Sequence, residues 1–285
     1  MKNKCIACGM KDFSVFGEQL ITCENCGLVG MDTIPSVKFL NKLYQQDYFF
    51  GKEYSDYKAD RLALEANFNK RKKFLKKYLT KDSRVAEIGC AYGYFLNLIK
   101  DSVSFSIGYD VSEDGVSYAK NDLNVNAVCG DFLSTKAIPE FDLVVMWDVV
   151  EHVPNPDRFI EHASKSLKTG GALAFTTGDV DALNARLRGM KWRMVHPPTH
   201  IFYFNKKSVE YILDKNGLEM ISFKHRATYR NVGSVINQLI VNREGLNKSS
   251  AIFQYALLFA TKTGLARLNF PLNLFDIMEV VAVKK

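Results

Sequence analysis

No stretch of the 285-residue sequence is apolar over the roughly 20 residues that a membrane-spanning helix needs. The opening "MKNKCIACGM" has no apolar core of the kind found in secretory signals, so none is expected. Only six cysteines occur, and four of them are grouped near the N-terminus in metal-ligand spacing. This usage favours a reducing cytoplasm over a disulfide scaffold.

The charge is not strongly of one sign. The formal net charge is +7, with 24% charged and 47% hydrophobic residues, so a packed globular core is expected. A mild basic bias is compatible with an anionic ligand, nucleic acid or a membrane surface and selects none of them.

Two common phosphate-binding signatures are also absent. The segment "VAEIGCAYGYF" reads as a strand, a glycine turn and a helix, but Gly89 and Gly93 give G-x-x-x-G rather than the dinucleotide pattern G-x-G-x-x-G. No Lys-Ser/Thr pair follows the turn, as a P-loop requires. Glu87 precedes the turn and would repel a pyrophosphate, whereas it suits a ligand with an ammonium or sulfonium group.

The N-terminal cysteines are spaced as C-x2-C, fourteen residues, and C-x2-C, and each pair is followed by glycine. Four thiolates at this spacing predict a closed, structural, tetrahedral zinc site, with two disulfides or an iron centre as the alternatives. Residues 1–30 are therefore expected to form a zinc-ribbon-like module that either staples a small segment or docks a substrate or partner. The predicted ligands are Cys5, Cys8, Cys23 and Cys26.

Residues 31–59 are expected to link this module to the main domain. The part "LYQQDYFFGKEYSDY" is dense in aromatic residues and has no clear period. Its aromatics either pack the module onto the main domain or cover a ligand cleft, with Tyr48, Tyr54 and Tyr57 as polar-tipped contacts. A helix over residues 60–79 follows, in which the basic run "KRKKFLKK" is interpreted as a solvated face rather than a phosphate-binding surface.

From residue 84 onward, apolar strands alternate with helices, which predicts an α/β fold with a doubly wound parallel sheet. The expected strands are "RVAEI", "FSIGYD", "NAVCGD", "FDLVVMWD" and "GGALAFTT". Ligands bind such sheets outside the carboxyl ends of the strands. The first four strands end in acidic or turn residues, and Asp110 stands about 20 residues beyond the glycine turn, where it could accept ribose hydroxyls.

The segments "VAEIGCAYGYF", "GYDVSEDGVSYAK", "VCGDF", "FDLVVMWDVVEHVPNPDRFIEHASKSLKTGGALAFTTGD" and "HPPTHIFYFNKKSVEYILDKNGLEMISF" together resemble class I S-adenosylmethionine-dependent methyltransferases of the small-molecule and glycoconjugate branch. The resemblance covers residues 60–285 and implies a Rossmann-like, seven-stranded sheet. Ala91 departs from the family, which usually has glycine there. The residues that the resemblance assigns to the cofactor are Glu87, Gly89, Cys90, Ala91, Gly93, Asp110, Val111, Asp131, Phe132, Trp147 and Asp148.

Methyl transfer to a hydroxyl needs a base. His200 and His196 lie in "WRMVHPPTHIFYF", a loop that rims the acceptor pocket in this family, so His200 is the first candidate and His196 the second. Either could instead brace the loop. His152, in "DVVEHV", is the third candidate, and Asp148, Glu151 and His152 could together hold a divalent cation, as in the ubiquinone-pathway O-methyltransferases that this segment resembles.

The last third is expected to contribute two antiparallel strands, "LEMISFKH" and "DIMEVVAVKK", separated by a helical insertion over about residues 229–273. Asn205 is expected to cap the helix that precedes them, and Ser112 to cap the helix that follows "FSIGYD". The apolar insertion is interpreted as a layer over the sheet, a homodimer face, or an interfacial surface that meets a membrane and a lipid-linked substrate.

Three functions compete. The first is O-methylation of a sugar or another small or lipid-linked saccharide acceptor, with sugar C-methylation as its variant because C-methyltransferases of sugars resemble the cysteine module ending in "CGLV". The second is RNA methylation, which is disfavoured because "WDVVEH" differs from the Asn/Asp-Pro-Pro-aromatic signature of many base-amine methyltransferases. The third is a non-catalytic cofactor-binding protein.

Overall fold

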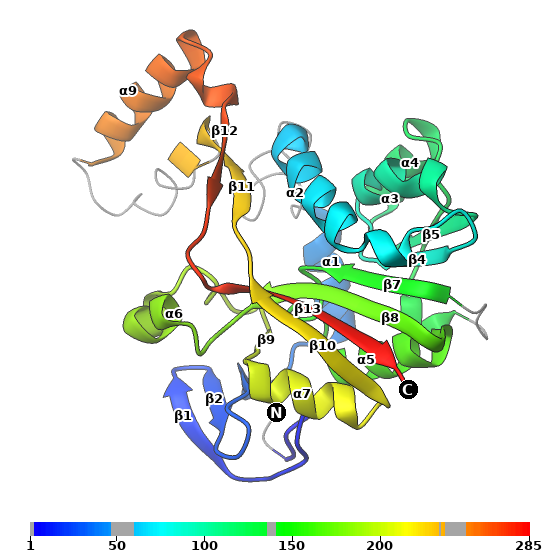
Figure 1. Cartoon of the computed structure of the whole chain (residues 1–285). Helices are drawn as coiled ribbons and strands as arrows, with labels where there is room; N and C mark the ends of the chain where they lie inside the picture. Colours follow the sequence, from blue (N-terminus) through cyan, green and yellow to red (C-terminus); the bar gives the residue numbers. More distant parts are fainter. Residues whose placement is uncertain (1–2, 47–59, 136–140, 234, 237–248) are drawn as a thin grey trace.

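The computed structural model describes residues 3–46, 60–135, 141–233, 235–236 and 249–285 (Figure 1). Tyr48, Tyr54 and Tyr57, the expected cover residues, lie outside the described residues. Along the chain the strands are β1 (Phe13–Gly17), β2 (Leu20–Cys23), β3 (Val29–Met31), β4 (Arg84–Ile88), β5 (Phe105–Asp110), β6 (Ala127–Cys129), β7 (Phe141–Trp147), β8 (Leu167–Gly178), β9 (Phe202–Tyr203), β10 (Leu218–His225), β11 (Thr228–Asn231), β12 (Asn269–Leu272) and β13 (Ile277–Lys284).

The helices complete this order. The α-helices are α1 (Val37–Gln46), α2 (Arg61–Phe74), α3 (Tyr94–Ile99), α4 (Glu113–Asn121), α5 (Pro156–Ser166), α6 (Leu183–Arg188), α7 (Lys206–Asp214) and α9 (Ser249–Lys262). Short 3-10 turns are η1 (Lys76–Tyr78), η2 (Lys100–Ser102), η3 (Phe132–Ser134), η4 (Gly189–Lys191) and η5 (Leu265–Arg267).

The central sheet has seven strands in the order β10-β13-β8-β7-β4-β5-β6, which confirms the predicted fold class. Strands β4, β5, β6, β7 and β8 are parallel, and β13 runs antiparallel between β8 and β10. The chain leaves β4 toward β5 and β6 and then returns to the other side of β4 as β7. This reversal of strand order creates a crevice at the carboxyl ends of β4 and β7, where open α/β sheets bind ligands.

Helices cover both faces of this sheet (Figure 1). Alternate residues of β7 separate the two cores: Val144 and Met146 pack with α5 and α7, whereas Leu143 and Val145 pack with α2, α3 and α4. Period-two alternation between two apolar faces explains why this strand is buried along almost its whole length.

Two predicted helix starts are confirmed. The Ser112 side chain accepts a hydrogen bond from the Gly115 N–H at the start of α4. Asn205 forms a capping box with Ser208 at the start of α7. Both side chains satisfy backbone donors that would otherwise lack partners at the first turn.

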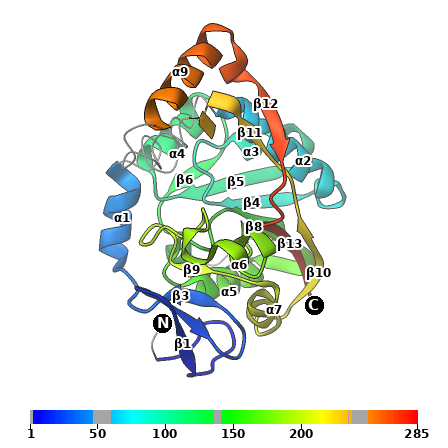
Figure 2. The same ribbon diagram turned by 90° about the vertical axis from the view of Figure 1, so that its left-hand side faces the viewer.

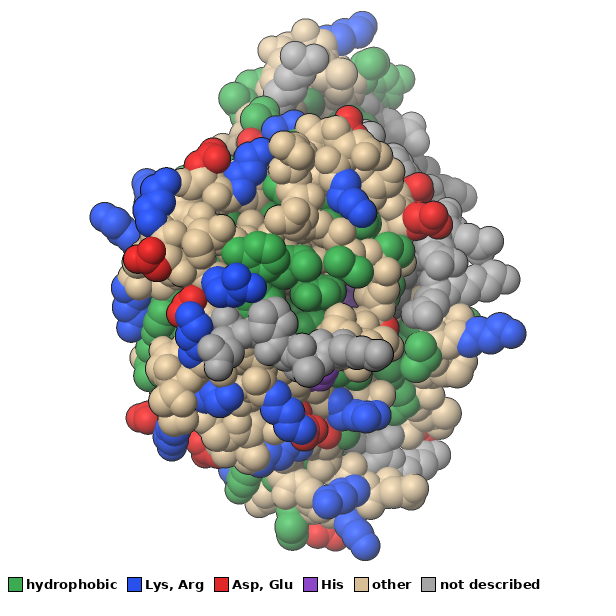
Figure 3. All heavy atoms as spheres, turned by 90° about the vertical axis from the view of Figure 1, so that its right-hand side faces the viewer, with side chains coloured by type: hydrophobic (Ala, Val, Ile, Leu, Met, Phe, Trp, Pro, Cys, Tyr) green, Lys and Arg blue, Asp and Glu red, His purple; other side chains and the backbone are tan. Residues whose placement is uncertain are grey.

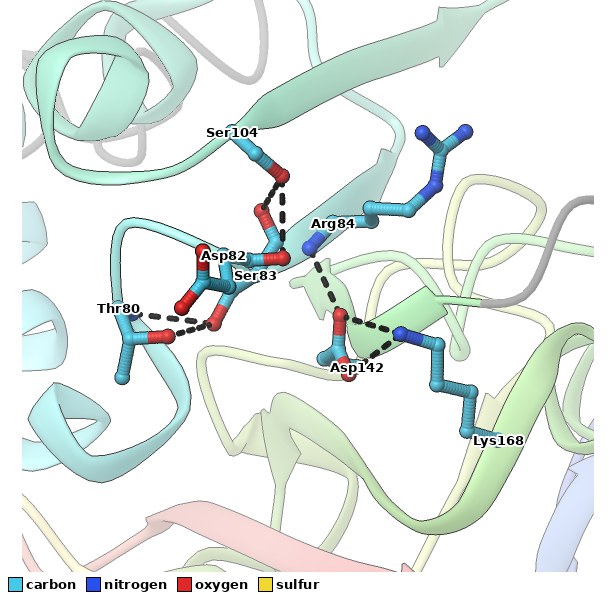
Figure 4. Close-up of polar contacts among 7 residues, drawn as sticks. All are labelled: Thr80, Asp82, Ser83, Arg84, Ser104, Asp142 and Lys168. Atoms are coloured by element: carbon cyan, nitrogen blue, oxygen red, sulfur yellow. Dashed lines mark hydrogen bonds and ion pairs between the residues drawn. The ribbon is translucent and has the colours of Figure 1, made fainter.

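The amino ends of the parallel strands are held by a separate set of polar contacts (Figure 4). The Arg84 N–H donates to Asp142 Oδ2 at 2.8 Å, and Lys168 Nζ reaches Asp142 Oδ1 at 2.9 Å. The Ser104 hydroxyl donates to the backbone carbonyl of Ser83 at 2.9 Å. These contacts tie β4, β5 and β7 together at the edge opposite the crevice.

The cysteine module is continuous with the main domain. Strands β1, β2 and β3 form an antiparallel sheet whose fourth strand is β9, from the loop that follows His200. Val29 pairs with Tyr203 and Gly30 with Phe202, and the Met31 N–H donates to the Ile201 carbonyl at 2.9 Å. The predicted boundary at residue 30 therefore falls inside a strand that is hydrogen-bonded to the main domain.

The insertion before the last strand differs from the expected helical layer. Strands β11 and β12 pair antiparallel into a two-stranded ribbon that rises from the sheet and carries α9 near its tip (Figures 1 and 2). The side chains of Tyr255, Leu258 and Phe259 on α9 are exposed. No helix within the described ranges has the length and apolar character to span a bilayer. A homodimer face or a membrane contact at α9 stays a prediction.

Candidate functional site

The glycine turn after β4 has the unusual backbone that its sequence suggests. Gly89, Ala91 and Gly93 all have positive φ, at 71°, 45° and 73°. A Cβ at Gly89 would come within 2.5 Å of Val149 Cγ2, so glycine is required there for space as well as conformation. Ala91 adopts the left-handed conformation despite its side chain, which places local strain where the family usually has glycine.

Asp110 joins this turn to the end of β5. Its Oδ2 accepts from the Ala91 N–H at 2.7 Å and its Oδ1 from the Ser112 N–H at 2.8 Å. The Asp110 carbonyl accepts from the Gly130 N–H at 2.8 Å, which brings the end of β6 alongside. Three consecutive strand ends therefore meet around one residue, Asp110.

The other predicted residues of this edge divide into open and buried groups. Asp131 is exposed and caps η3 through Leu133, and Val111 is partly buried. Phe132 is buried against Tyr109, Phe159 and His162, so its ring belongs to the core. Cys90 is also buried in the core.

Glu87 is a buried acid at the base of the turn, with 2% of its surface exposed. Its Oε2 atom has no hydrogen-bond partner among the described residues. Burial raises the pKa of the Glu87 carboxyl well above its usual range, Arg71 opposes the rise, and Asp110 adds to it. An unpaired buried carboxylate is costly, so this atom is suited to a cationic ligand.

Arg71 is a functional candidate that the sequence interpretation missed. It lies within the basic run assigned to solvent, yet its guanidinium is buried over the Trp147 ring at 4.5 Å. Its Nη2 donates to Thr176 Oγ1 at 3.3 Å and to Asp148 Oδ2 at 3.4 Å. The signal was its spacing, because Arg71 occupies the helix face between the buried Phe68 and Leu75.

Asp148 directly follows β7, at the end of the strand that faces the crevice. It has φ of 55°, a conformation that aspartate tolerates better than most residues, and its Oδ1 accepts from Thr176 Oγ1 at 2.9 Å. The neighbouring Trp147 has a buried Nε1 that has no acceptor among the described residues. The end of β7 therefore carries an indole and a carboxylate in succession beside the crevice.

A hollow of about 220 Å³ opens beside these residues. Its walls come from α2, the end of β7, the loop after β8, and β11, and they carry Arg71, Trp147, Asp148, Glu151, His152, His196 and His200. All three histidines proposed from the sequence therefore line one cavity. The predicted cofactor residues from Glu87 to Asp131 do not line it but follow the adjacent strand ends.

Two of the histidines have a defined partner at Nδ1. His200 Nδ1 lies 2.8 Å from the Met194 carbonyl, and His152 Nδ1 lies 3.0 Å from the Thr199 carbonyl. Because a carbonyl can only accept, each of these Nδ1 atoms carries a proton, and the neutral form of each ring has its lone pair on Nε2. The His200 ring centroid is 4.4 Å from that of His152 and 3.8 Å from that of His196.

Electrostatics keep His200 neutral. Burial lowers the pKa of the His200 imidazole well below its usual range, and the neighbouring His152 and His196 lower it further. Glu151, His152 and His200 each bring one ligand atom within 4.8 Å of the others. The cation set expected from the sequence is therefore changed, because His200 and not Asp148 groups with Glu151 and His152.

The four N-terminal cysteines converge as predicted. Their sulfur atoms lie within 4.8 Å of one another, with Cys5–Cys26 and Cys8–Cys23 at 3.5 Å. Zinc–sulfur bonds of about 2.3 Å in a tetrahedron require sulfurs about 3.8 Å apart. Backbone N–H groups of the two C-x2-C turns also point at the sulfurs of Cys5, Cys23 and Cys26.

Comparison with known proteins gives one family match. The model of the family described as "Methyltransferase domain" matches residues 57–222, more than half of the chain. Ubiquinone biosynthesis O-methyltransferase of Coxiella burnetii (strain RSA 493 / Nine Mile phase I) is 32% identical over 114 residues, covering 38% of this chain and 49% of the relative. Its mitochondrial counterpart in Dictyostelium discoideum is 26% identical over 163 residues, covering 49% and 51%. The chain thus spans about half the length of the curated relatives it matches.

Solved structures share the fold. Magnesium protoporphyrin IX methyltransferase of Synechocystis PCC 6803, determined with bound SAH, aligns with a TM-score of 0.57. The alignment covers 88% of this chain and 100% of that one at 13% sequence identity. At this identity the similarity establishes the architecture alone.

Proposed function

Because the chain belongs to the methyltransferase-domain family, we propose that it transfers a methyl group from S-adenosylmethionine to a hydroxyl of a sugar or another small, saccharide-bearing acceptor. Membership of the family makes the protein an enzyme of methyl transfer. The names of its relatives support oxygen as the acceptor atom. The saccharide acceptor is the finer part of the proposal and rests on the resemblance of the cysteine module to sugar methyltransferases.

The observation that carries the cofactor assignment is the unpaired, buried Oε2 of Glu87 beside the glycine turn. S-adenosylmethionine carries an ammonium and a sulfonium, which such an acid would pair with. A second observation fits the adenosine part: among the described residues, no heavy atom outside its chain neighbours lies within 4 Å of a Cβ built on Gly130, so the described surface is open at the end of β6. The donor and acceptor set therefore suits this cofactor.

Each polar group of S-adenosylmethionine would have a partner among these residues. Glu87 would hold the ammonium of the methionine part, and Arg71, the buried cation beside it, would hold the carboxylate. A carboxylate has about four acceptor sites, so Asp110 can accept ribose hydroxyls while keeping its two backbone bonds. Asp131 would receive the adenine amine, and Trp147 and Asp148 would lie near the sulfonium. The cofactor supplies a methyl group on a good leaving group, and the protein aligns the acceptor with it.

His200 is the best candidate to take the acceptor proton. Its Nε2 lone pair is fixed by the Nδ1 bond to the Met194 carbonyl, and its lowered pKa keeps it neutral at physiological pH. His196 lies against it in the same cavity, and His152 faces it from the other side. A positioned base contributes about 10²–10⁴-fold to such a step.

A divalent cation is the alternative means of activating the acceptor. Glu151, His152 and His200 would be its ligands, and both histidines already donate Nδ1–H to carbonyls in the way that ligating histidines do. Such a cation would lower the pKa of an acceptor hydroxyl. For the cysteine cluster we propose structural zinc, because four thiolates with backbone donors around them match its preferred environment.

RNA is the less favoured acceptor. The face drawn in Figure 3 lies at the amino ends of the parallel strands, away from the crevice, and carries lysines and arginines scattered among acidic and neutral side chains. The hollow beside the histidines has the size of a small-molecule site rather than an extended groove.

Two experiments test the proposal. Calorimetry should detect S-adenosylmethionine binding that Glu87→Gln weakens at least tenfold, while Glu113→Gln, at an exposed acid of α4, has no effect. Absence of binding to the wild type would refute the cofactor assignment. For the acceptor, mass spectrometry of glycans and nucleotide sugars should find one methyl group missing when the gene is deleted, and an unchanged saccharide profile with loss of a methyl group elsewhere would refute the saccharide.

A further inference from the structure

A second hollow, of about 90 Å³, adjoins the histidine-lined cavity. The two share four lining residues: Arg193, Thr228, Arg230 and Ile277. Its walls come from the loop after α6, from the residues just before and within β11, and from the start of β13. An acceptor whose hydroxyl lies beside His200 would therefore extend along β11 into this second hollow.

Guanidinium groups are gathered in the second hollow. Three arginines line it, Arg193, Arg226 and Arg230, together with the acid Asp276. Asp276 is almost fully buried, and its oxygens already accept from Trp192 Nε1 at 2.9 Å, Asn184 Nδ2 at 2.9 Å and Arg193 Nη2 at 2.8 Å. Arg226 is paired with Glu279, so the described lining offers guanidinium donors, rather than a large net charge, next to a partly apolar wall.

Two of the three arginines, Arg193 and Arg226, are held in place before any ligand arrives. Arg193 is fixed by Asp276, and its buried Nε has no acceptor among the described residues. Arg226 donates from Nε to Glu279 at 2.8 Å and stacks over the Phe74 ring at 4.4 Å. Guanidinium groups with fixed orientation lose less entropy on binding a planar or tetrahedral oxyanion, so they are suited to phosphate.

We propose that this second hollow is a subsite for a phosphoryl group of the acceptor, so that the substrate is a phosphate or diphosphate ester whose hydroxyl is methylated in the adjoining cavity. The inference rests on the proposed function and deepens it by naming the chemical class of the acceptor. The phosphoryl group can come from a nucleotide or from a lipid carrier, since both present the same oxygens to the arginines.

Titration of the full-length protein with inorganic pyrophosphate, at constant ionic strength, tests the subsite. Arg230→Gln should weaken pyrophosphate binding at least tenfold, as expected for the loss of one charge-assisted contact. Arg230→Lys, which keeps the charge, should retain part of the affinity. Arg186→Gln, at an exposed arginine of α6 outside the hollow, is the matched control and should leave binding unchanged.

Absence of pyrophosphate binding, or equal affinity in Arg230→Gln and the control, would overturn the inference. S-adenosylmethionine affinity is measured on the same proteins. Cofactor binding without pyrophosphate binding refutes the subsite alone, and the reverse refutes the proposed cofactor alone. A nucleoside diphosphate and a short prenyl diphosphate are then compared with pyrophosphate, and the one that binds more tightly identifies the source of the phosphoryl group.

Discussion

Arg71→Met removes the buried guanidinium that we assign to the methionine carboxylate while keeping an apolar stem against Trp147 and Phe68. Opposite charges about 4 Å apart interact by roughly 4 kcal/mol at an effective dielectric constant near 20. Desolvation of both groups reduces this, so the net loss should be about 1.5–3 kcal/mol, which is about 10- to 150-fold in affinity.

The assay compares two ligands that differ in the methionine tail. S-adenosylhomocysteine carries the carboxylate and ammonium, whereas methylthioadenosine lacks both. Arg71→Met should weaken the first by the stated factor and leave the second within about twofold. Lys73→Met, at an exposed position on the same helix, is the matched control and should leave both affinities unchanged.

The fold should tolerate this substitution. The contacts of Arg71 to Thr176 and Asp148 are long, at 3.3 and 3.4 Å, and the Thr176–Asp148 bond of 2.9 Å does not depend on it. Thermal melting should therefore show a small shift. Equal weakening of both ligands would mean that Arg71 only shapes the pocket, and unchanged affinity for S-adenosylhomocysteine would remove it from the cofactor site.

The remaining predictions concern a proton, a backbone strain and a metal. Because burial raises the pKa of Glu87 in the folded protein, the contribution of Glu87 to stability is complete below its unfolded pKa and falls as pH rises. Pairing of Glu87 with the ammonium of S-adenosylmethionine should release a proton, so the affinity for this cofactor should rise with pH. Glu87→Gln should abolish the dependence of the binding heat on the buffer. Ala91→Gly relieves a positive φ and should be neutral to stabilising by about 1 kcal/mol in urea unfolding; clear destabilisation would show that the methyl group is needed. Chelation of the metal at the four cysteines should lower turnover and leave the affinity for S-adenosylmethionine nearly unchanged, and zinc release is measured with a colorimetric dye. Loss of cofactor binding would contradict a role of the cysteine module that is separate from cofactor binding.

The existence of the strands and their succession along the chain could be predicted from the sequence, because continuous apolar runs, helix caps and acidic strand ends are local signals. Ser112 and Asn205 cap helices as expected, and Glu87, Asp110 and Asp148 lie at the crevice edge. Arg71 was missed because a basic run was interpreted by its average character, although one residue in it continues an apolar helix face.

The ribbon of β11 and β12 could not be predicted by the same means. Each strand has only four residues, and Pro271 within β12 argues against a strand. Their pairing joins Thr228 to Leu272 across the insertion, and no local pattern specifies such a contact. That ribbon supplies a wall of both hollows, so part of the proposed acceptor site could not be predicted from the sequence either.

Strand β9 connects the cysteine module to the loop that carries His200. This strand has two residues, too few for any periodic signal, yet it begins two residues after His200 and pairs with β3. The Tyr203 hydroxyl donates to the His200 carbonyl at 3.1 Å, and the Ile201 N–H donates to the Glu151 carbonyl at 2.8 Å. The four-cysteine cluster belongs to the module whose sheet includes β9. An ion bound to these cysteines would therefore help to fix the backbone around His200, the proposed base. The module would in this way support the acceptor side of the proposed site through β9.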